Sequence, residues 1–107
     1  MVIGNLTSLN QGSAICYPAP SFDPVSSLEA IEKYKCTSLY GVPTMYTATL
    51  AEQQKLKKNV STLCKGVTAG SLCPKPLAER IYNELNMKGL CNFYGMTELS
   101  PVATFVT

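Results

Sequence analysis

The sequence predicts an α/β protein in which strands and helices alternate along a mostly parallel sheet. Short apolar runs, each long enough for one strand, are separated by longer segments with helical periodicity. Prolines stand at the positions where the helical segments begin. This alternation is typical of parallel strands joined by right-handed crossover helices. With 107 residues, of which 46% are hydrophobic, the chain has room for about one domain with a modest core.

Five short apolar runs bounded by turn residues predict the strands. In chain order they are residues 14–17, 36–40, 66–69 and 90–94, with residues 102–106 as a possible fifth. The first dozen residues show no clear period, and we expect them to form a partly ordered terminus.

Three helices are predicted between these strands, over residues 24–34, 43–57 and 76–88. Asp23 before Pro24 suits an N-cap followed by proline at the first helical position. Pro43 and Pro76 open the other two helices in the same way. Gly89 suits the left-handed residue that ends the third helix.

The charge pattern argues against nucleic acid or an anionic membrane as a partner. The net charge is only +2. The one lysine cluster, at positions 55, 57 and 58, ends a predicted helix, so we expect these side chains to complement the helix dipole in solvent and not to bind an anion. No stretch is long and apolar enough to span a bilayer, and the first residues lack the basic head and apolar centre of a signal peptide. The compartment is instead predicted from the cysteines: free thiols suit a reducing environment, so we expect an intracellular protein, with cytoplasm and mitochondrion left open.

The sequence has five cysteines, no Cys-x-x-Cys spacing and no histidine. A structural zinc site and histidine-dependent nucleophilic catalysis are therefore not expected within these residues. Cys16, Cys36 and Cys91 lie in apolar runs and are expected to be small core side chains. Cys73 lies in a proline-rich loop and is expected to be the accessible thiol, an incidental surface cysteine. Free thiols fit a reducing compartment.

The most informative local pattern is the pentapeptide Tyr-Gly-Met-Thr-Glu at residues 94–98. It follows an apolar run, so Thr97 and Glu98 should lie on the loop beyond the carboxyl end of a strand, where open α/β sheets bind ligands. Taken alone, a Thr-Glu pair is more often a helix cap or a solvated turn. A threonine hydroxyl can nevertheless bond a phosphate oxygen, and one glutamate can hold Mg²⁺ against that phosphate. The pattern thus indicates a nucleotide-phosphate and metal corner.

These residues resemble the Tyr-Gly-x-Thr-Glu signature of the adenylate-forming, or AMP-binding, superfamily, which includes acyl-CoA synthetases, peptide-synthetase adenylation domains and luciferases. Two further blocks resemble the family in the same order. Residues 39–46 resemble the Tyr-Gly-x-Pro-Thr-Met-Phe segment of fatty acyl-CoA ligases, and residues 66–71 resemble the small-residue strand and turn that follows. The Ser-Pro-Val at residues 100–102 is typical of the medium-chain branch. The resemblance implies that residues 1–107 are part of one AMP-binding domain, a piece of the large N-terminal domain of these enzymes.

The resemblance also implies roles for individual residues. Thr97 would contact the α-phosphate and Glu98 would bind Mg²⁺, which makes them the catalytic pair, while Tyr94 would lie against the adenine ring. Backbone at Gly70 and Ser71 would line the nucleotide and acyl pockets, although this chain has two additional residues before the proline that often follows there. The implied cofactor-binding residues are Gly70, Ser71, Tyr94, Gly95, Met96 and Thr97.

The implied activity is that of an ATP-dependent fatty acyl-CoA ligase, which adenylates a carboxylate with ATP and Mg²⁺ and then transfers the acyl group to CoA. The family's glycine-rich phosphate loop, its ribose-binding aspartate and its lid lysine have no match in this sequence, and Asp23 stands at a helix start instead. We therefore expect an interior piece of a larger enzyme, inactive on its own. Its partners would be fatty acid, ATP, CoA and the missing portions of the same enzyme, and its outer strands would be exposed edges that lower solubility. The alternative is a non-catalytic nucleotide-binding or protein-interaction remnant.

Overall fold

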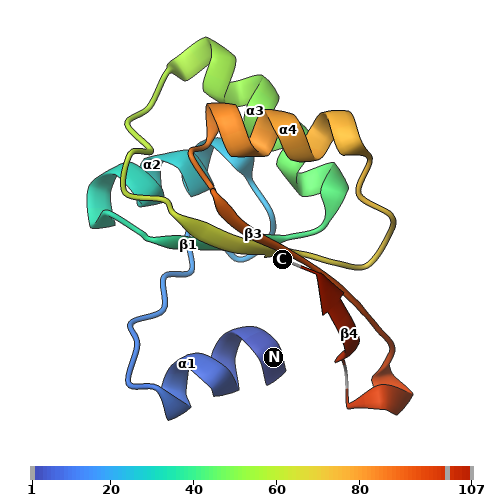
Figure 1. The fold of residues 1–107 in the computed structure, drawn as a ribbon. Coiled ribbons are helices and arrows are strands. Elements are labelled where there is room, and N and C mark those ends of the chain that lie inside the picture. Colours follow the sequence, from blue (N-terminus) through green and yellow to red (C-terminus); the bar gives the residue numbers. More distant parts are fainter. Residues whose placement is uncertain (1, 101, 107) are drawn as a thin grey trace.

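The computed structural model describes residues 2–100 and 102–106, and these form one α/β unit (Figure 1). Pro101, part of the Ser-Pro-Val motif, lies outside the described residues. The described strands make a single sheet in the order β1-β2-β3-β4. They are β1 (Ser38–Gly41), β2 (Lys65–Thr68), β3 (Gly89–Gly95) and β4 (Val102–Val106). The mostly parallel α/β fold is confirmed.

The strand β4 runs antiparallel to β3, whereas β1, β2 and β3 are parallel. The cause is the length of the connection. A parallel strand needs a crossover of a dozen or more residues. Only one turn of 3-10 helix, η2 (Thr97–Leu99), and a few neighbouring residues separate β3 from β4. The chain therefore folds back on itself at η2, the turn that carries Thr97 and Glu98.

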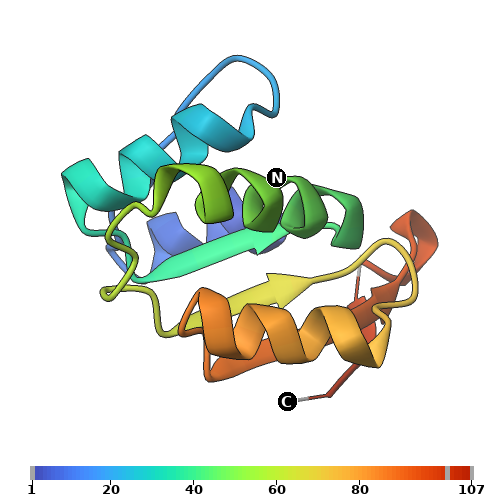
Figure 2. The same cartoon turned by 90° about the horizontal axis from the view of Figure 1, so that it is seen from above.

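Three helices cover one face of the sheet, as Figures 1 and 2 show. They are α2 (Pro24–Tyr34), α3 (Pro43–Leu56) and α4 (Lys75–Glu84). The predicted start of α2 is confirmed, because an Asp23 side-chain oxygen accepts a hydrogen bond of 3.1 Å from the Val25 N–H. The other Asp23 side-chain oxygen accepts one of 2.9 Å from the Ser26 hydroxyl. These bonds satisfy donors that the first helical turn leaves free.

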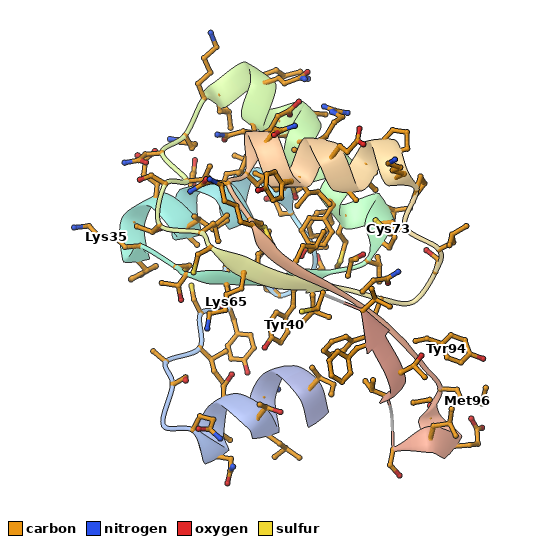
Figure 3. The ribbon with its side chains drawn as sticks, viewed as in Figure 1. Lys35, Tyr40, Lys65, Cys73, Tyr94 and Met96 are labelled. Carbon is orange, nitrogen blue, oxygen red and sulfur yellow. The ribbon has the colours of Figure 1, made fainter. Side chains whose placement is uncertain are left out.

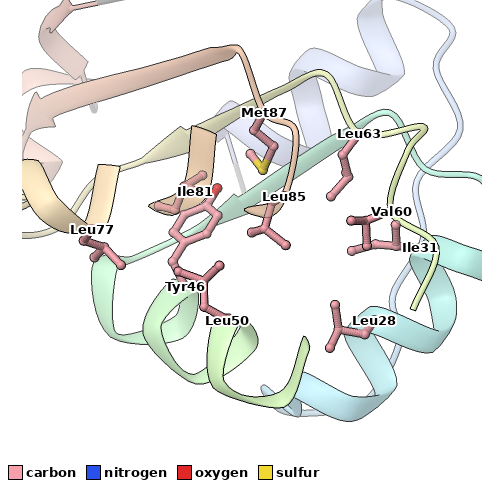
Figure 4. Packing of buried hydrophobic residues seen from close by; sticks show 10 residues of the cluster. All are labelled: Leu28, Ile31, Tyr46, Leu50, Val60, Leu63, Leu77, Ile81, Leu85 and Met87. Atoms are coloured by element: carbon pink, nitrogen blue, oxygen red, sulfur yellow. The ribbon is translucent and has the colours of Figure 1, made fainter. Parts of the chain in front are cut away.

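The core lies between these helices and the sheet (Figure 4). Its buried apolar residues are Leu28, Ile31, Tyr46, Leu50, Val60, Leu63, Leu77, Ile81, Leu85 and Met87. Every strand-to-helix unit contributes to this single cluster. Burial of that apolar surface is the main term that holds the layers together.

Tyr46 on α3 ties the helix layer to the sheet. Its side chain is 1% exposed, and its hydroxyl lies 2.8 Å from the Leu39 carbonyl oxygen and 2.9 Å from that of Val67. The layers meet closely at this point. A Cβ atom added at Gly66 would collide with the Met87 side chain and with the Leu39 carbonyl oxygen. Glycine at position 66 is therefore a packing requirement of the sheet.

The prediction of a strand at residues 14–17 is wrong. This segment has no regular structure, and Tyr17 is 68% exposed. A run of four apolar residues becomes a strand only where another strand pairs with it, and no described strand does. Residues before it are more ordered than expected: they form a π-helical turn, η1 (Val2–Leu6), and a short helix, α1 (Thr7–Asn10). Figure 1 shows these turns on the sheet face opposite α2, α3 and α4.

The predicted end of the third helix is also wrong. Helix α4 ends at Glu84, and the left-handed residue that follows is Asn86, with φ of 58°. Asparagine tolerates this conformation better than most residues. Gly89 instead begins β3, where an added Cβ would lie 3.2 Å from the Cys64 carbonyl oxygen. It is needed for the close approach of β3 to β2.

Candidate functional site

A cleft of about 320 Å³ opens near the carboxyl ends of the three parallel strands. Parallel strands end on the same edge of a sheet, and ligands of open α/β folds bind there. The cleft is lined by Ile3, Tyr40, Gly41, Val67, Ala69, Gly70, Phe93, Gly95, Met96, Thr97 and Val102. These lining residues are uncharged and mostly apolar, as in many small-molecule sites.

The three sequence blocks that resembled one family meet at this cleft. Gly41 comes from the end of β1, Gly70 from the loop after β2, and residues 95–97 from the end of β3 and the start of η2. Strand register explains the convergence, since Gly41 pairs with Thr68 and Thr68 pairs with Asn92 across the sheet. Segments more than 20 residues apart in sequence are thus brought to one edge.

Gly70 has a specific conformational role in the loop after β2. Its φ is +89°, a value that residues with a Cβ rarely adopt. An added Cβ would also lie 3.0 Å from Cγ1 of Val42. Glycine therefore allows the loop to turn tightly against the start of α3, and it leaves bare backbone facing the cleft.

Some of the residues expected at the site line the cleft and others lie beside it. Gly70, Gly95, Met96 and Thr97 are lining residues. The remaining expected residues, Ser71, Tyr94 and Glu98, are exposed and stand outside the lining. Figure 3 shows Tyr94 projecting outward beside β3 and β4, and Met96 close to η2. The Tyr94 side chain is 61% exposed, so its ring is open to a flat partner such as a base.

Thr97 and Glu98 lie on the one-turn helix η2. The turn is closed by the Leu99 N–H, which donates to the Met96 carbonyl at 2.9 Å, and by Ser100 in the left-handed conformation, with φ of 61°. Within the described residues, neither the Thr97 hydroxyl nor the Glu98 carboxylate has a hydrogen-bond or ion-pair partner in the protein. Both side chains are therefore free to bind a ligand.

The donors at this corner suit a magnesium ion held mainly by a substrate. No group of three or more cysteine, aspartate, glutamate or histidine side chains that could hold a metal occurs among residues 2–100 and 102–106. One carboxylate and one hydroxyl are hard oxygen donors, which Mg²⁺ prefers. Mg²⁺ commonly binds through one or two carboxylates, substrate phosphates and water.

Sequence reasoning missed the apolar wall of the cleft. The wall is formed by strand residues that point away from the helices, namely Tyr40, Val67 and Phe93. Successive residues of a strand point to opposite faces, so the two-residue period was the sequence signal that could have grouped them. Figure 3 shows Tyr40 on the sheet face toward α1. Phe93 is also held by Phe105 of β4, with ring centroids 5.8 Å apart. Ile3 carried no such signal, because its segment had no clear period.

The cysteine expectations are partly wrong. Cys16 is exposed, not a core residue, whereas Cys36 and Cys91 are half-buried. Cys73 is half-buried against the core, so it is not the accessible thiol that its loop position suggested. Within the described residues, no helix is long and apolar enough to cross a membrane.

Curated relatives match nearly all of this chain but only a small part of their own length. The chain is 44% identical to "Acyl-CoA ligase SID4" of Ajellomyces capsulatus over 101 residues, covering 94% of this chain and 17% of the relative. It is 41% identical to the human "Medium-chain acyl-CoA ligase ACSF2, mitochondrial" over 101 residues, covering 94% of this chain and 16% of the relative. The chain thus spans about one sixth of the length of these relatives.

A solved structure shares the fold. The anthranilate CoA ligase AuaEII, solved in complex with anthranoyl-AMP, superposes with a TM-score of 0.76 at 24% sequence identity, covering 87% of this chain and 18% of that chain. The family model described as "AMP-binding enzyme" matches residues 1–107. The chain therefore belongs to the AMP-binding enzyme family.

Proposed function

We propose that residues 1–107 form one wall of the nucleotide site in an ATP-dependent, AMP-forming acyl-CoA ligase, as part of a single AMP-binding domain. The observation that carries the proposal is the meeting of three sequence blocks at one cleft, with a free hydroxyl and a free carboxylate on the adjoining turn. The names of the curated relatives support the ligase class.

The proposed reaction has two steps. A fatty acid carboxylate oxygen attacks the α-phosphorus of ATP, the bond to the bridging oxygen breaks, and pyrophosphate leaves with the electron pair. The sulfur of CoA, having lost its proton, then attacks the acyl carbon, and AMP leaves as the thioester forms. The first step concentrates negative charge on phosphate oxygens, so it depends on donors already in position.

Thr97 and Glu98 would act on that charge. In the proposal, the Thr97 hydroxyl donates a hydrogen bond to an oxygen of the α-phosphate, and the Glu98 carboxylate holds Mg²⁺ beside it. When bound, Mg²⁺ supplies positive charge that stabilises the developing charge on the phosphate oxygens. Both residues lie on one turn, so a single local conformation positions the pair.

The other proposed contacts follow from exposure and backbone geometry. The Tyr94 ring, which is exposed, would lie against the adenine. Backbone at Gly70, Ser71 and Gly95 would approach the nucleotide closely, because two of these residues have no side chain. Met96 adds an apolar contact on the cleft side. Fatty acid, ATP and CoA are thus the proposed small-molecule partners, with other portions of the same enzyme completing the site.

The deciding experiment uses the protein encoded by the whole transcript that contains this sequence. Pyrophosphate release is measured with a medium-chain fatty acid, MgATP and CoA. We expect Thr97→Val and Glu98→Gln each to lower kcat by about 100-fold or more, because the first removes a hydrogen-bond donor to the phosphate and the second weakens the proposed hold on Mg²⁺. The charge-matched control is Glu79→Gln, an exposed position on α4, which should leave kcat unchanged.

The outcome that contradicts the proposal is an active ligase in which Glu98→Gln and Glu79→Gln behave alike. A transcript that encodes only these residues would favour the second candidate, a non-catalytic nucleotide-binding or protein-interaction module. That candidate is tested on the 107-residue chain by titrating AMP while recording amide NMR shifts. Shifts confined to residues 95–97 and Gly70, without pyrophosphate release, would support it.

We infer an intracellular location, either cytoplasmic or mitochondrial. The support is chemical: in the described part of the chain all five cysteines are free thiols, which fits a reducing compartment. Localisation of the tagged, complete protein by fluorescence microscopy tests this, and secretion into the medium would contradict it.

A further inference from the structure

Lysines gather at the edge of the sheet opposite the candidate site. Three segments lead from the last turn of a helix to the first residue of the next strand, namely residues 31–38, 53–65 and 81–89. Seven of the nine Lys and Arg side chains of the sequence lie in these segments, and we call them the basic rim: Lys33, Lys35, Lys55, Lys57, Lys58, Lys65 and Lys88. All are exposed except Lys58, which is half-buried. Figure 3 shows Lys35 and Lys65 on the side of the molecule away from Tyr94 and Met96.

Backbone contacts hold the three segments of the rim side by side. The Asn59 N–H donates to the Glu32 carboxylate at 2.9 Å, which joins the loop after α3 to the end of α2. The Gly89 N–H donates to the Cys64 carbonyl oxygen at 2.9 Å, and Lys65 pairs with Gly89 across the sheet. The seven lysines therefore belong to one edge of the fold, where β1, β2 and β3 begin.

The charge of the chain is divided between this edge and the rest of the molecule. The acidic residues in the three rim segments are Glu32 and Glu84, so these segments carry a formal charge of +5 and the rest of the chain carries −3. The net charge of +2, from which no anionic membrane partner is expected, conceals this separation.

Helix dipoles do not account for so many lysines. Each of the three helix C-termini contributes about −0.5 of an elementary charge, or about −1.5 together. Glu52, which lies 3.7 Å from Lys55 and just outside the rim segments, offsets one further charge. An excess of about +2.5 remains after both are counted.

Exposed apolar side chains lie among these lysines. The last turn of each helix carries one, and they are Tyr34 of α2, Leu56 of α3 and Tyr82 of α4. The Lys33 Nζ lies 5.2 Å from the centre of the Tyr34 ring, and the Lys88 Nζ lies 6.0 Å from that of Tyr82. Tyrosine suits a membrane interface because it has an apolar ring and a polar tip. Binding of a protein surface to a bilayer increases with both apolar contact and attraction to anionic lipids.

We propose that the basic rim is a docking surface for a lipid bilayer that contains acidic phospholipids. The kind of cation favours a bilayer over nucleic acid or an acidic peptide. All seven side chains are lysines, which act as flexible point charges, whereas arginine is the residue that binds phosphate with two hydrogen bonds and stacks on bases. The one arginine of the sequence, Arg80, lies outside the rim. The lysines are also spread over three helix ends and do not converge on a cleft, which suits a flat partner.

Docking through the rim orients the candidate site. The cleft opens near the carboxyl ends of β1, β2 and β3, whereas the rim lies at their amino ends. A bilayer on the rim therefore leaves the cleft open to the aqueous phase, where ATP and CoA are dissolved. This docking goes beyond the proposed ligase function and does not depend on catalysis, so lipid binding alone can test it.

The test measures co-sedimentation of the folded 107-residue chain with lipid vesicles. Vesicles of phosphatidylcholine with about one-third phosphatidylserine are compared with vesicles of phosphatidylcholine alone. We expect binding to the anionic vesicles only. This binding should fall by about tenfold or more when NaCl is raised from about 0.05 M to about 0.5 M, because salt screens exposed charges. Equal binding to both kinds of vesicle, or no binding to the anionic ones, would overturn the proposal.

Charge-matched variants decide whether the rim is the surface that binds. Lys65→Gln/Lys88→Gln removes two charges from the rim, and the control Lys75→Gln/Arg80→Gln removes two charges from α4 outside it. Each lysine close to an anionic bilayer changes binding by about fivefold, so the rim pair should weaken binding by about tenfold or more and the control pair by less than about twofold. Circular dichroism checks that each variant is folded.

A second pair of rim substitutions keeps the result independent of one variant. Lys33→Gln/Lys55→Gln removes two charges from α2 and α3 and should weaken vesicle binding to the same degree. A duplex DNA oligonucleotide serves as the competing polyanion, and we expect the native chain to bind it more weakly than the anionic vesicles. Equal losses in the rim and control pairs, or tighter binding to the duplex than to the vesicles, would contradict a membrane-docking rim.

Discussion

Replacing Tyr46 with phenylalanine removes one buried hydroxyl and leaves the ring in the core. The hydroxyl lies 2.8 Å from the Leu39 carbonyl oxygen and 2.9 Å from the Val67 carbonyl oxygen, so it joins α3 to both β1 and β2. Loss of a buried hydrogen bond costs about 1–3 kcal/mol when its partner is left unsatisfied. We therefore expect Tyr46→Phe to lower the free energy of unfolding by about 1–3 kcal/mol near neutral pH.

The same variant should show a characteristic pH dependence. Burial raises the pKa of Tyr46 well above its ordinary value, so the folded chain keeps its proton at high pH. The unfolded chain releases that proton near pH 10, so the stabilising term is complete below about pH 10 and is lost as the pH rises. At about pH 11 the native chain should lose about 1.4 kcal/mol from this residue. Tyr46→Phe has no such loss, so the cost of the substitution should shrink by that amount.

The measurement is urea unfolding followed by circular dichroism, at about pH 8 and about pH 11. The difference in unfolding free energy between the native chain and Tyr46→Phe gives the cost of the substitution at each pH. Groups that titrate alike in both chains cancel in that difference. Tyr82→Phe is the matched control because Tyr82 lies on α4 with a side chain that is 48% exposed. Its cost should stay below about 0.5 kcal/mol at either pH. A Tyr46→Phe cost that does not change between the two pH values would refute the argument that the folded chain holds this proton.

Three further substitutions test the packing around the site, each by urea unfolding. Gly66→Ala should cost about 3 kcal/mol or more, because the collision includes backbone that cannot move aside, whereas Gly41→Ala, with ordinary contacts of 3.5 Å, should cost much less. Thr68→Val should stabilise the chain by about 1 kcal/mol, because the Thr68 hydroxyl is buried and has no partner among the described residues. Thr49→Val should instead destabilise it, since that hydroxyl donates at 2.8 Å. Asp23→Ala should cost about 1 kcal/mol through the lost N-cap of α2. Equal effects of Thr68→Val and Thr49→Val would contradict the unsatisfied state of the Thr68 hydroxyl. A tolerated Gly66→Ala would contradict the close packing at Gly66, and a neutral Asp23→Ala would contradict the N-cap bond.

The sequence correctly predicted the helix starts that depend on neighbouring residues in the chain. The cap at Asp23 and the proline at Pro43 determine where α2 and α3 begin, and both are visible in the sequence. The direction of β4 depends on the shortness of its connection, which also could have been counted. The prediction of a strand at residues 14–17 was wrong for a different reason. Strand formation there depends on a partner strand, and short-range pattern carries no information about one.

The part of the site that follows from strand topology could be predicted from the sequence. Whether a given side chain points into the cleft could not. Once β1, β2 and β3 are parallel, the ends of all three must share an edge, so Gly70 and Thr97 meet there. Whether Ser71 faces the cleft depends on loop dihedrals that the sequence does not display. The inserted residues before Pro74 add to that freedom. Tyr94 lies on β3 next to Phe93, which lines the cleft, so strand alternation places the Tyr94 side chain on the other side.

The apolar wall of the cleft was hidden by the composition of the strands themselves. Strands of parallel sheets that are covered on both faces read as continuous apolar runs, so alternation shows which residues share a face but not which face holds the site. In this chain Leu39 packs against the core cluster, while Tyr40 turns to the opposite face and is 46% exposed. Phe93 takes that same opposite face beside Phe105. A sequence that carries apolar residues on both faces therefore specifies the sheet without showing which face holds the site. The structure distinguishes the two faces by burial, because the core cluster that includes Tyr46 packs between the helices and one face of the sheet.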